Sequence, residues 1–131
     1  MAAANRPLSP HLQVYRPQIT SFISIMHRLT GVAMAFGTIL FTYWLASAAY
    51  GAEAFERAQS LMGSWFGLVV LLGFTFSIYF HFANGIRHLF WDMGKGIDLP
   101  SAYRSGWIVI AAAIVLTISG WVCGYYSMGA L

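Results

Sequence analysis

The chain has 131 residues, of which 59% are apolar, 17% aromatic and only 8% charged. Ordinary soluble domains carry roughly 25% charged residues, so seven basic and four acidic side chains are too few to cover a soluble protein of this size. The same composition excludes a disordered chain, a coiled coil and a collagen. The sequence therefore predicts an integral membrane protein with a single membrane-anchor domain, residues 1–131.

Three stretches of the chain contain no charged residue. They are residues 29–52, 58–86 and 105–131, which are 24, 29 and 27 residues long. Each exceeds the about 20 residues that cross a hydrocarbon core, and in lipid only a helix satisfies the backbone of such a run. We therefore predict transmembrane helices at about 25–50, 62–91 and 105–127. The fold class is all-α, an integral membrane three-helix bundle.

The basic residues predict the orientation. Six of the seven flank the start of the first helix or the connection between the second and third: Arg6, Arg16, Arg28, Arg87, Lys95 and Arg104. The other connection holds only Arg57. Basic loops stay on the cytoplasmic or matrix side, so we expect the N-terminus inside and the C-terminus outside. The net charge of +3 thus reflects topology and does not indicate a nucleic-acid partner.

The N-terminal segment predicts the type of membrane. The first apolar run begins only after about twenty residues, among them Pro7, Pro10 and Pro17. This pattern lacks the short apolar region of a cleaved signal and the Arg- and Ser-rich composition of a transit peptide. We therefore expect an inner membrane, the bacterial cytoplasmic membrane in preference to the mitochondrial one.

The second predicted helix has a polar face near its end. At 100° per residue, a sector about 100° wide holds Ser77, His81, Asn84, Gly85, His88 and Asp92. A neutral histidine in a helical bundle is a common haem ligand. Gly85 would let a flat macrocycle approach the backbone, and His88 could meet a propionate. The alternative is a histidine that hydrogen-bonds a neighbouring helix or lies near a water cavity.

The first predicted helix carries a narrow stripe of small and polar residues, which we expect to face the bundle: Ser24, Arg28, Gly31, Ala35, Thr38 and Thr42. Arg28 is its only charge. The arginine either snorkels to the lipid headgroups or donates to a carbonyl oxygen that becomes negative during reduction. A quinone headgroup fits the second description, and a lipid phosphate fits it as well.

His27 belongs to the same segment. We expect it at the level of His88, a turn or two shallower than His81. His27 and His81 should therefore not ligate one iron, and the second axial ligand of any haem is expected from another subunit.

Three motifs give the chain a family resemblance. They are Arg6-Pro-Leu-Ser-Pro-His-Leu-Gln-Val-Tyr15, Ser24-Ile-Met-His-Arg28-Leu-Thr-Gly31 and His81-Phe-Ala-Asn-Gly-Ile-Arg-His88-Leu-Phe-Trp-Asp92. Together they resemble the cytochrome b subunits of succinate dehydrogenase, the larger membrane anchors of respiratory complex II. The resemblance extends over the whole chain, including its length and three-helix plan.

The resemblance implies roles for particular residues. His81 would be an axial ligand of haem b, with the other ligand from the smaller anchor subunit. Ser24 and Arg28 would line the ubiquinone site, with Ile25 as an apolar wall. His27 and His88 would lie near the haem propionates. No residue of this chain is implied to be catalytic in succinate oxidation itself.

The resemblance also implies partners and a reaction. A flavoprotein subunit would oxidise succinate, and an iron–sulfur subunit would pass the electrons to ubiquinone, which links the tricarboxylic acid cycle to respiratory electron transport. This chain has neither a cysteine cluster nor a GxGxxG motif, so those centres must lie on the partners. Two alternatives remain: the anchor of a fumarate reductase, and a small membrane assembly or transport protein without a cofactor.

Overall fold

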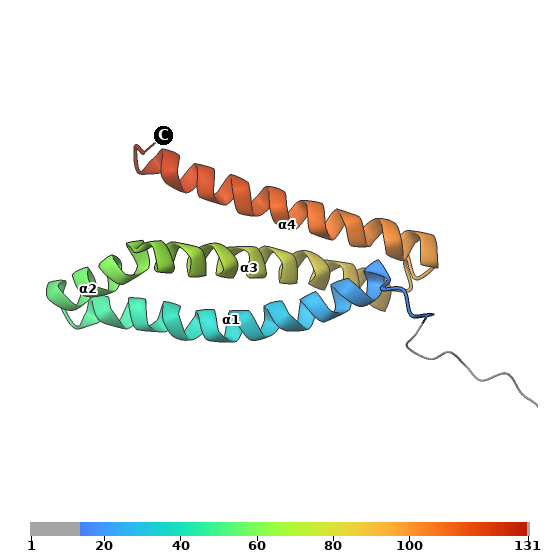
Figure 1. Cartoon of the computed structure of the whole chain (residues 1–131), viewed down its shortest axis with the longest axis horizontal. Helices are drawn as coiled ribbons and strands as arrows, with labels where there is room; N and C mark the ends of the chain where they lie inside the picture. Colours follow the sequence, from blue (N-terminus) through green and yellow to red (C-terminus); the bar gives the residue numbers. More distant parts are fainter. Residues whose placement is uncertain (1–13, 131) are drawn as a thin grey trace, which may run out of the picture.

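Four helices make up the computed structural model, which describes residues 14–130. They are α1 (Ile19–Ala49), α2 (Ala52–Gly63), α3 (Trp65–Asp92) and α4 (Leu99–Ser127), and this part of the chain contains no strand. The three long helices run along one axis, and the short α2 lies where α1 turns back into α3 (Figure 1). Most of the first sequence motif, Arg6–Tyr15, lies outside the described residues.

The prediction of three apolar membrane-spanning helices is confirmed. By length and composition, α1, α3 and α4 are each long and apolar enough to cross a membrane. In an apolar 18-residue stretch of each helix, only 11% of the residues in α1, 17% in α3 and 22% in α4 are buried within the chain. Large apolar side chains such as Phe36 and Ile39 are about two-thirds exposed. Lipid or further subunits must cover these faces, because water does not solvate such a surface favourably.

Two helix starts differ from the prediction by about six residues. We predicted 25 and 105, whereas α1 begins at Ile19 and α4 at Leu99. At α4, the Asp98 carboxylate accepts a hydrogen bond from the Ser101 backbone N–H at 3.1 Å, and Pro100 occupies the first turn. This bond, with a further one from the Ser101 side chain, lowers the pKa of Asp98. Charge-free stretches mark where lipid begins, whereas capping residues decide where a helix begins.

The short helix α2 is a feature that the sequence analysis did not predict. Its range contains charged Glu53, Glu56 and Arg57, and Arg57 pairs with Glu53 on the exposed face at 2.6 Å. Gly51 has φ of +109°, a backbone conformation that glycine adopts readily, and allows the sharp turn from α1. The apolar residues on the other face of α2 hold it against α1 and α3, so the connection is helical.

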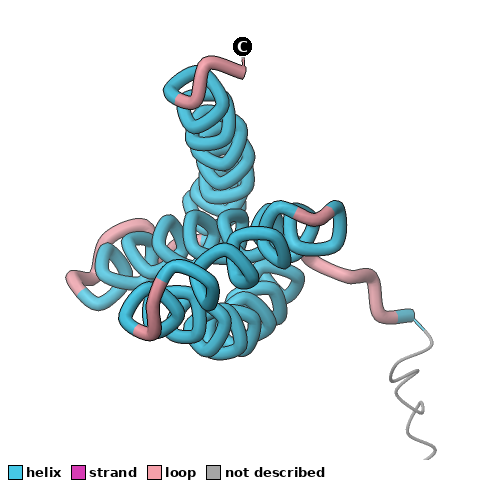
Figure 2. The backbone as a smooth tube through the Cα atoms, turned by 90° about the vertical axis from the view of Figure 1, so that its left-hand side faces the viewer, coloured by secondary structure: helices cyan, strands magenta, loops and turns pink. Residues whose placement is uncertain are grey.

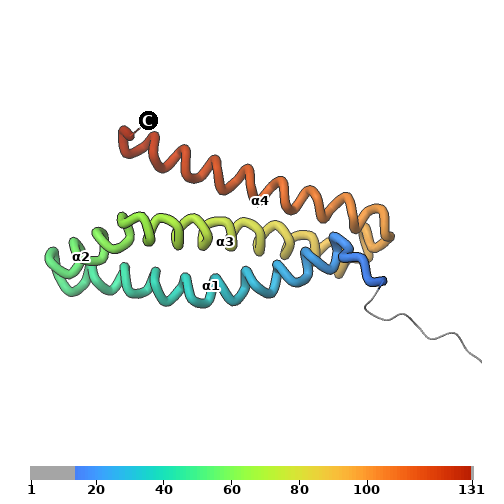
Figure 3. Tube along the Cα trace, viewed as in Figure 1, coloured from blue at the N-terminus to red at the C-terminus, as the bar shows by residue number. Residues whose placement is uncertain are grey.

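The helices meet most closely at one end of the bundle, which contains the start of α1 and the α3–α4 connection (Figure 3). We call it the basic end, after Arg16, Arg28, Lys95 and Arg104. Just inside it, a core forms from Ile23 of α1, Phe80 of α3, and Val109 and Ala113 of α4. From there α4 diverges, so that its C-terminal end stands apart from α1 and α3 (Figure 2).

Gly37 allows close packing between α1 and α3 farther along the bundle. A Cβ atom at this position would overlap the ring of Phe74, whereas one at Gly73 would meet nothing within 4 Å. We expect Gly37→Ala to lower the free energy of unfolding by about 1–3 kcal/mol, the usual cost of overpacking. Thermal unfolding of the detergent-purified protein measures the effect, with Gly73→Ala as the matched control. Equal midpoints for the two variants would contradict this packing.

Candidate functional site

Three histidine side chains gather between α1 and α3 near the basic end. The rings of His27 and His81 are stacked, with centroids 3.8 Å apart and an interplanar angle of 15°. His88 lies on the other side of His27, with 5.4 Å between their ring centroids. The ring of His88 in turn meets Trp91 edge to face at 5.0 Å. The structure thus brings together all three histidines that the sequence analysis singled out.

The ring of His27 lies closer to His81 than to His88. We expected His27 level with His88, a turn or two shallower than His81. The longer α1 explains the difference, because His27 is in the third turn of the helix and not at its start. Two imidazoles that bind one iron from opposite sides must have the metal between them. Face-to-face rings 3.8 Å apart leave no room for it, so this arrangement does not provide both axial ligands.

The surroundings of His81 select one tautomer of its imidazole. Nδ1 lies 3.1 Å from the backbone oxygen of His27 and 3.3 Å from Oγ1 of Thr30. A carbonyl oxygen only accepts hydrogen bonds, so Nδ1 carries the proton and Nε2 keeps a free lone pair. A histidine that binds a metal is typically oriented in this way by a bond from its other nitrogen.

Thr30 completes the support of His81, and the sequence analysis gave it no role. Its hydroxyl lies 2.8 Å from the Met26 oxygen and 3.0 Å from the His27 oxygen, so it donates within its own helix. Its lone pairs are then free to accept from His81. The signal was present, because a threonine inside an apolar helix usually bonds the preceding turn. Only the pairing of α1 with α3 could connect it to His81.

Two glycines leave space around His81. At Gly31 of α1, a Cβ atom would lie 3.2 Å from Cε1 of His81, so the glycine lets the imidazole approach α1 closely. At Gly85 of α3, one turn from His81, nothing lies within 4 Å of the Cβ position. A flat ligand could therefore lie against the backbone there, as the sequence predicted. Nδ1 of His27 is buried without a hydrogen-bond partner among the described residues, so the site has an unused polar atom.

The quinone-site residues predicted from the resemblance lie on the outer side of α1. Ser24, Ile25 and Arg28 are exposed, and Ile25 is 56% exposed. The expectation that their stripe faces this chain's own bundle holds for Gly31, which lies against His81, but is wrong for the rest, because Ala35, Thr38 and Thr42 are exposed as well. Ile23, Thr30 and Gly37 are buried in their place. The stripe is a surface that another subunit or lipid would cover.

Arg87 has a structural role that the sequence analysis missed. We used it only to predict orientation, yet its side chain is buried and joins α3 to α4. Nε donates to Ser105 Oγ at 2.9 Å, and Nη2 donates to the Ala102 oxygen at 2.8 Å. The guanidinium carbon lies 3.9 Å from the centre of the Trp91 ring, a cation–π contact. Arg87 thereby fixes the end of α3 that carries His88.

Asn84 lies at the centre of the packed basic end and is fully buried. Its Oδ1 accepts from Nη1 of Arg87 at 3.3 Å, whereas its Nδ2 has no partner among the described residues. The polar face of α3 is therefore divided: Asn84 contacts Arg87, and His81 contacts α1.

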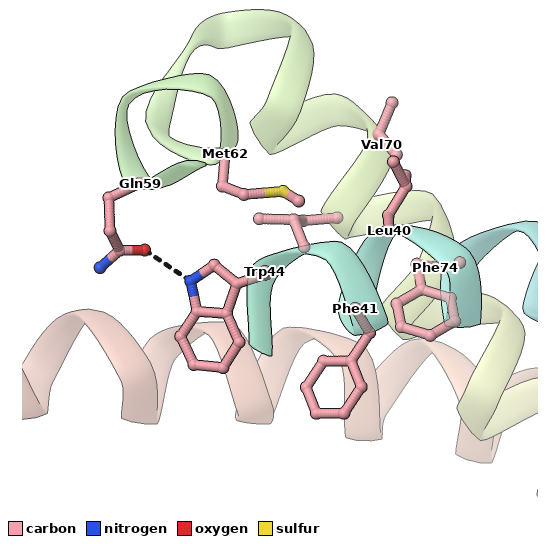
Figure 4. Close-up of a pocket in the computed structure, with 9 residues that line it drawn as sticks. Leu40, Phe41, Trp44, Gln59, Met62, Val70 and Phe74 are labelled. Atoms are coloured by element: carbon pink, nitrogen blue, oxygen red, sulfur yellow. Dashed lines mark hydrogen bonds between the residues drawn. The ribbon is translucent and has the colours of Figure 1, made fainter. Parts of the chain in front are cut away.

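A separate apolar cavity of about 300 Å³ lies at the opposite end of the bundle, between α1, α2 and α3. Figure 4 shows Trp44 at its side, where the indole donates to Oε1 of Gln59 at 2.9 Å. The ring of Trp44 also contacts Phe55, with centroids 5.8 Å apart. These contacts hold α2 over α1. None of the predicted site residues lines this cavity.

The fold and the histidine cluster together define an integral membrane protein with imidazoles held between its helices near one membrane face. Residues 2–120 match the family model of the succinate dehydrogenase/fumarate reductase transmembrane subunit, and the chain belongs to this family.

Curated relatives agree with this assignment. The chain is 42% identical to the succinate dehydrogenase cytochrome b556 subunit of Paracoccus denitrificans, over 87% of this chain and 88% of the relative. It is 40% identical to the succinate dehydrogenase cytochrome b556 subunit of Rickettsia prowazekii, over 89% of this chain and 91% of the relative. It is also 35% identical to the b560 subunit of Marchantia polymorpha, over 95% of each chain.

Proposed function

We propose that this chain is a membrane-anchor subunit of a succinate:ubiquinone oxidoreductase, that it holds haem b with a smaller anchor subunit, and that it forms part of the ubiquinone site. The His81 imidazole carries the proposal, because its Nδ1–H is held by the His27 carbonyl oxygen and its Nε2 is left free. The cytochrome names of the relatives support a haem. Their succinate dehydrogenase names favour this reaction over that of a fumarate reductase.

His81 is the iron ligand in this proposal. Bound haem would supply a one-electron redox centre beside the path of the electrons. A residue of the smaller anchor subunit would hold the iron together with His81. His27 shields one face of the His81 ring. His27 and His88 would lie near the haem propionates. Gly31 and Gly85 provide the close approach that the imidazole and a macrocycle require.

Ser24, Ile25 and Arg28 form this chain's part of the ubiquinone site. Ser24 and Arg28 are four residues apart and share one helix face, so a hydroxyl and a guanidinium could address the same headgroup. Ubiquinone takes up two electrons and two protons, and negative charge on its oxygen rises between these transfers. The Arg28 cation stabilises that charge, Ser24 holds the carbonyl and Ile25 packs against the ring. The exposure of all three fits a site that partner subunits complete.

The partners are a flavoprotein subunit, an iron–sulfur subunit and the smaller anchor, with lipid around the helices. The soluble subunits would dock at the basic end, where the quinone residues lie. This places the N-terminus inside and the C-terminus outside, in a bacterial cytoplasmic membrane.

Purification of the complex through a tag on this chain tests the proposal. We expect three further subunits by mass, a b-type reduced-minus-oxidised spectrum, and quinone reduction that depends on succinate. A colourless preparation without the flavoprotein would contradict the proposal and favour a cofactor-free assembly or transport protein. Faster fumarate reduction by a quinol would favour the fumarate reductase.

A further inference from the structure

A second cavity lies at the basic end, in the groove between α3 and α4. It has a volume of about 300 Å³. From the α3–α4 connection to Arg87, its lining mixes polar and charged residues with apolar ones: Ile86, Arg87, Phe90, Trp91, Lys95, Gly96, Ser101 and Ser105. The lining residues farthest from the connection are all apolar: Ala83, Ile108 and Val109.

This cavity is separate from the histidine cluster. At 100° per residue, the α3 residues that line it, such as Ile86 and Phe90, lie roughly 140–180° around the helix from His81 and His88. Neither histidine lines the cavity, nor do Ser24, Ile25 and Arg28. A ligand here would therefore occupy a different face of the chain from the proposed haem and quinone.

The cavity contains positive charge without a matching negative charge. Arg87 is only 6% exposed, and a guanidinium has five N–H donors. Three of these N–H groups donate to neutral acceptors. One N–H group on Nη1 and one on Nη2 therefore have no partner among the described residues. Within residues 14–130, neither Arg87 nor Lys95 forms an ion pair. Asp92 and Asp98, the acidic residues of the connection, do not line the cavity.

The end of α3 is built to place Lys95 at this opening. Gly94 adopts φ of +73° and Gly96 φ of +69°. The N–H of Lys95 donates to the Phe90 oxygen at 2.9 Å, and the Trp91 indole donates to the Gly96 oxygen at 3.0 Å. These bonds fold the connection back over the groove.

We propose that the groove between α3 and α4 binds an anionic phospholipid, with the phosphate against Arg87 and Lys95 and an acyl chain along Ile86, Ile108 and Val109. The ligand must be amphiphilic, because both cations line the part of the cavity from the connection to Arg87, and only apolar residues line it beyond. A buried cation without an acidic partner favours an anion, and basic pockets between transmembrane helices recognise acidic headgroups. A free phosphate would leave the deep apolar part unfilled.

Lipid binding to the purified complex tests the proposal. The probe is phosphatidylglycerol, compared with phosphatidylcholine of the same acyl chains, and binding is followed by native mass spectrometry. We expect selective retention of phosphatidylglycerol. Lys95→Gln should weaken it about fivefold, the effect of one lysine at a membrane surface, and Lys95→Arg should retain it. Lys95 is exposed, so these variants should leave the fold unchanged.

Arg104→Gln is the matched control, because Arg104 is an exposed cation at the same end that does not line the cavity. We expect it to bind phosphatidylglycerol like the unmodified complex. If Lys95→Gln and Arg104→Gln weakened phosphatidylglycerol binding equally, the effect would be a general one of surface charge, and the proposal would be overturned. Equal retention of the two lipids would overturn it too, and displacement by inorganic phosphate would identify a free-anion site in its place.

Discussion

His81→Ala should remove most of the b-type absorbance of the purified complex. Alanine provides no donor atom for iron, and among residues 14–130 no other histidine has its Nδ1 hydrogen-bonded in the same way as His81. The measurement is the reduced-minus-oxidised spectrum, normalised to the amount of complex. An unchanged spectrum at full haem occupancy would contradict the assignment of His81 as a ligand.

His27→Phe is the control for this variant. The phenyl ring keeps a planar group against His81, where the two rings are now 3.8 Å apart, but has no nitrogen. The backbone oxygen of residue 27, which orients His81, is retained. We therefore expect the haem to remain bound. If His27→Phe lost the haem and His81→Ala kept it, His27 and not His81 would be the iron ligand.

Arg28→Leu should lower succinate:quinone reductase activity by about 10²–10³-fold, whereas succinate oxidation with an artificial dye should persist. The size of this decrease follows from the loss of one charged hydrogen-bond donor to a quinone oxygen that becomes negative during the reaction. The dye assay reports the soluble subunits alone. Leucine suits an exposed helix face in lipid, so the variant should still insert into the membrane. Ser24→Ala should have a smaller effect, because only a neutral hydrogen bond is lost.

Thr38→Val is the matched control for Arg28→Leu. Thr38 lies on the same exposed stripe of α1, ten residues farther along, which corresponds to about 15 Å. Its hydroxyl bonds the Met34 oxygen within the helix. We expect both activities to stay normal in this variant. Equal loss of quinone and dye activity in Arg28→Leu would indicate failed assembly and contradict a role at the quinone.

The lipid environment explains why much of the fold could be predicted. A helix is the only open segment that satisfies its backbone in a bilayer, so charge-free length alone located three spans. The same reasoning failed for α2, because a short amphipathic helix next to charged residues resembles a loop in composition. Its contacts with α1, such as the bond between Trp44 and Gln59, join residues that a periodicity argument treats separately.

The candidate site was predicted in part for the same reason. Polar residues are costly in lipid, so His81, His88 and Arg28 stand out in the sequence. Periodicity gives the residues that share a face, but it does not say what that face meets. The stripe with Arg28 therefore appeared to face the bundle, whereas all of it except Gly31 lies on the outside. The supporting roles of Thr30 and Asn84 were invisible for the same reason.

A three-span membrane protein with histidines near one end could be predicted from residue order alone, because both conclusions depend on the cost of placing each residue in lipid. The partners that those residues meet became clear only from the packing of the helices. The stacking of His27 on His81, the bond from His81 to the His27 oxygen and the burial of Arg87 each depend on the relative position of two helices. That position is set by contacts between distant residues, such as Gly106 with Ile23 and Gly37 with Phe74, which no local pattern contains.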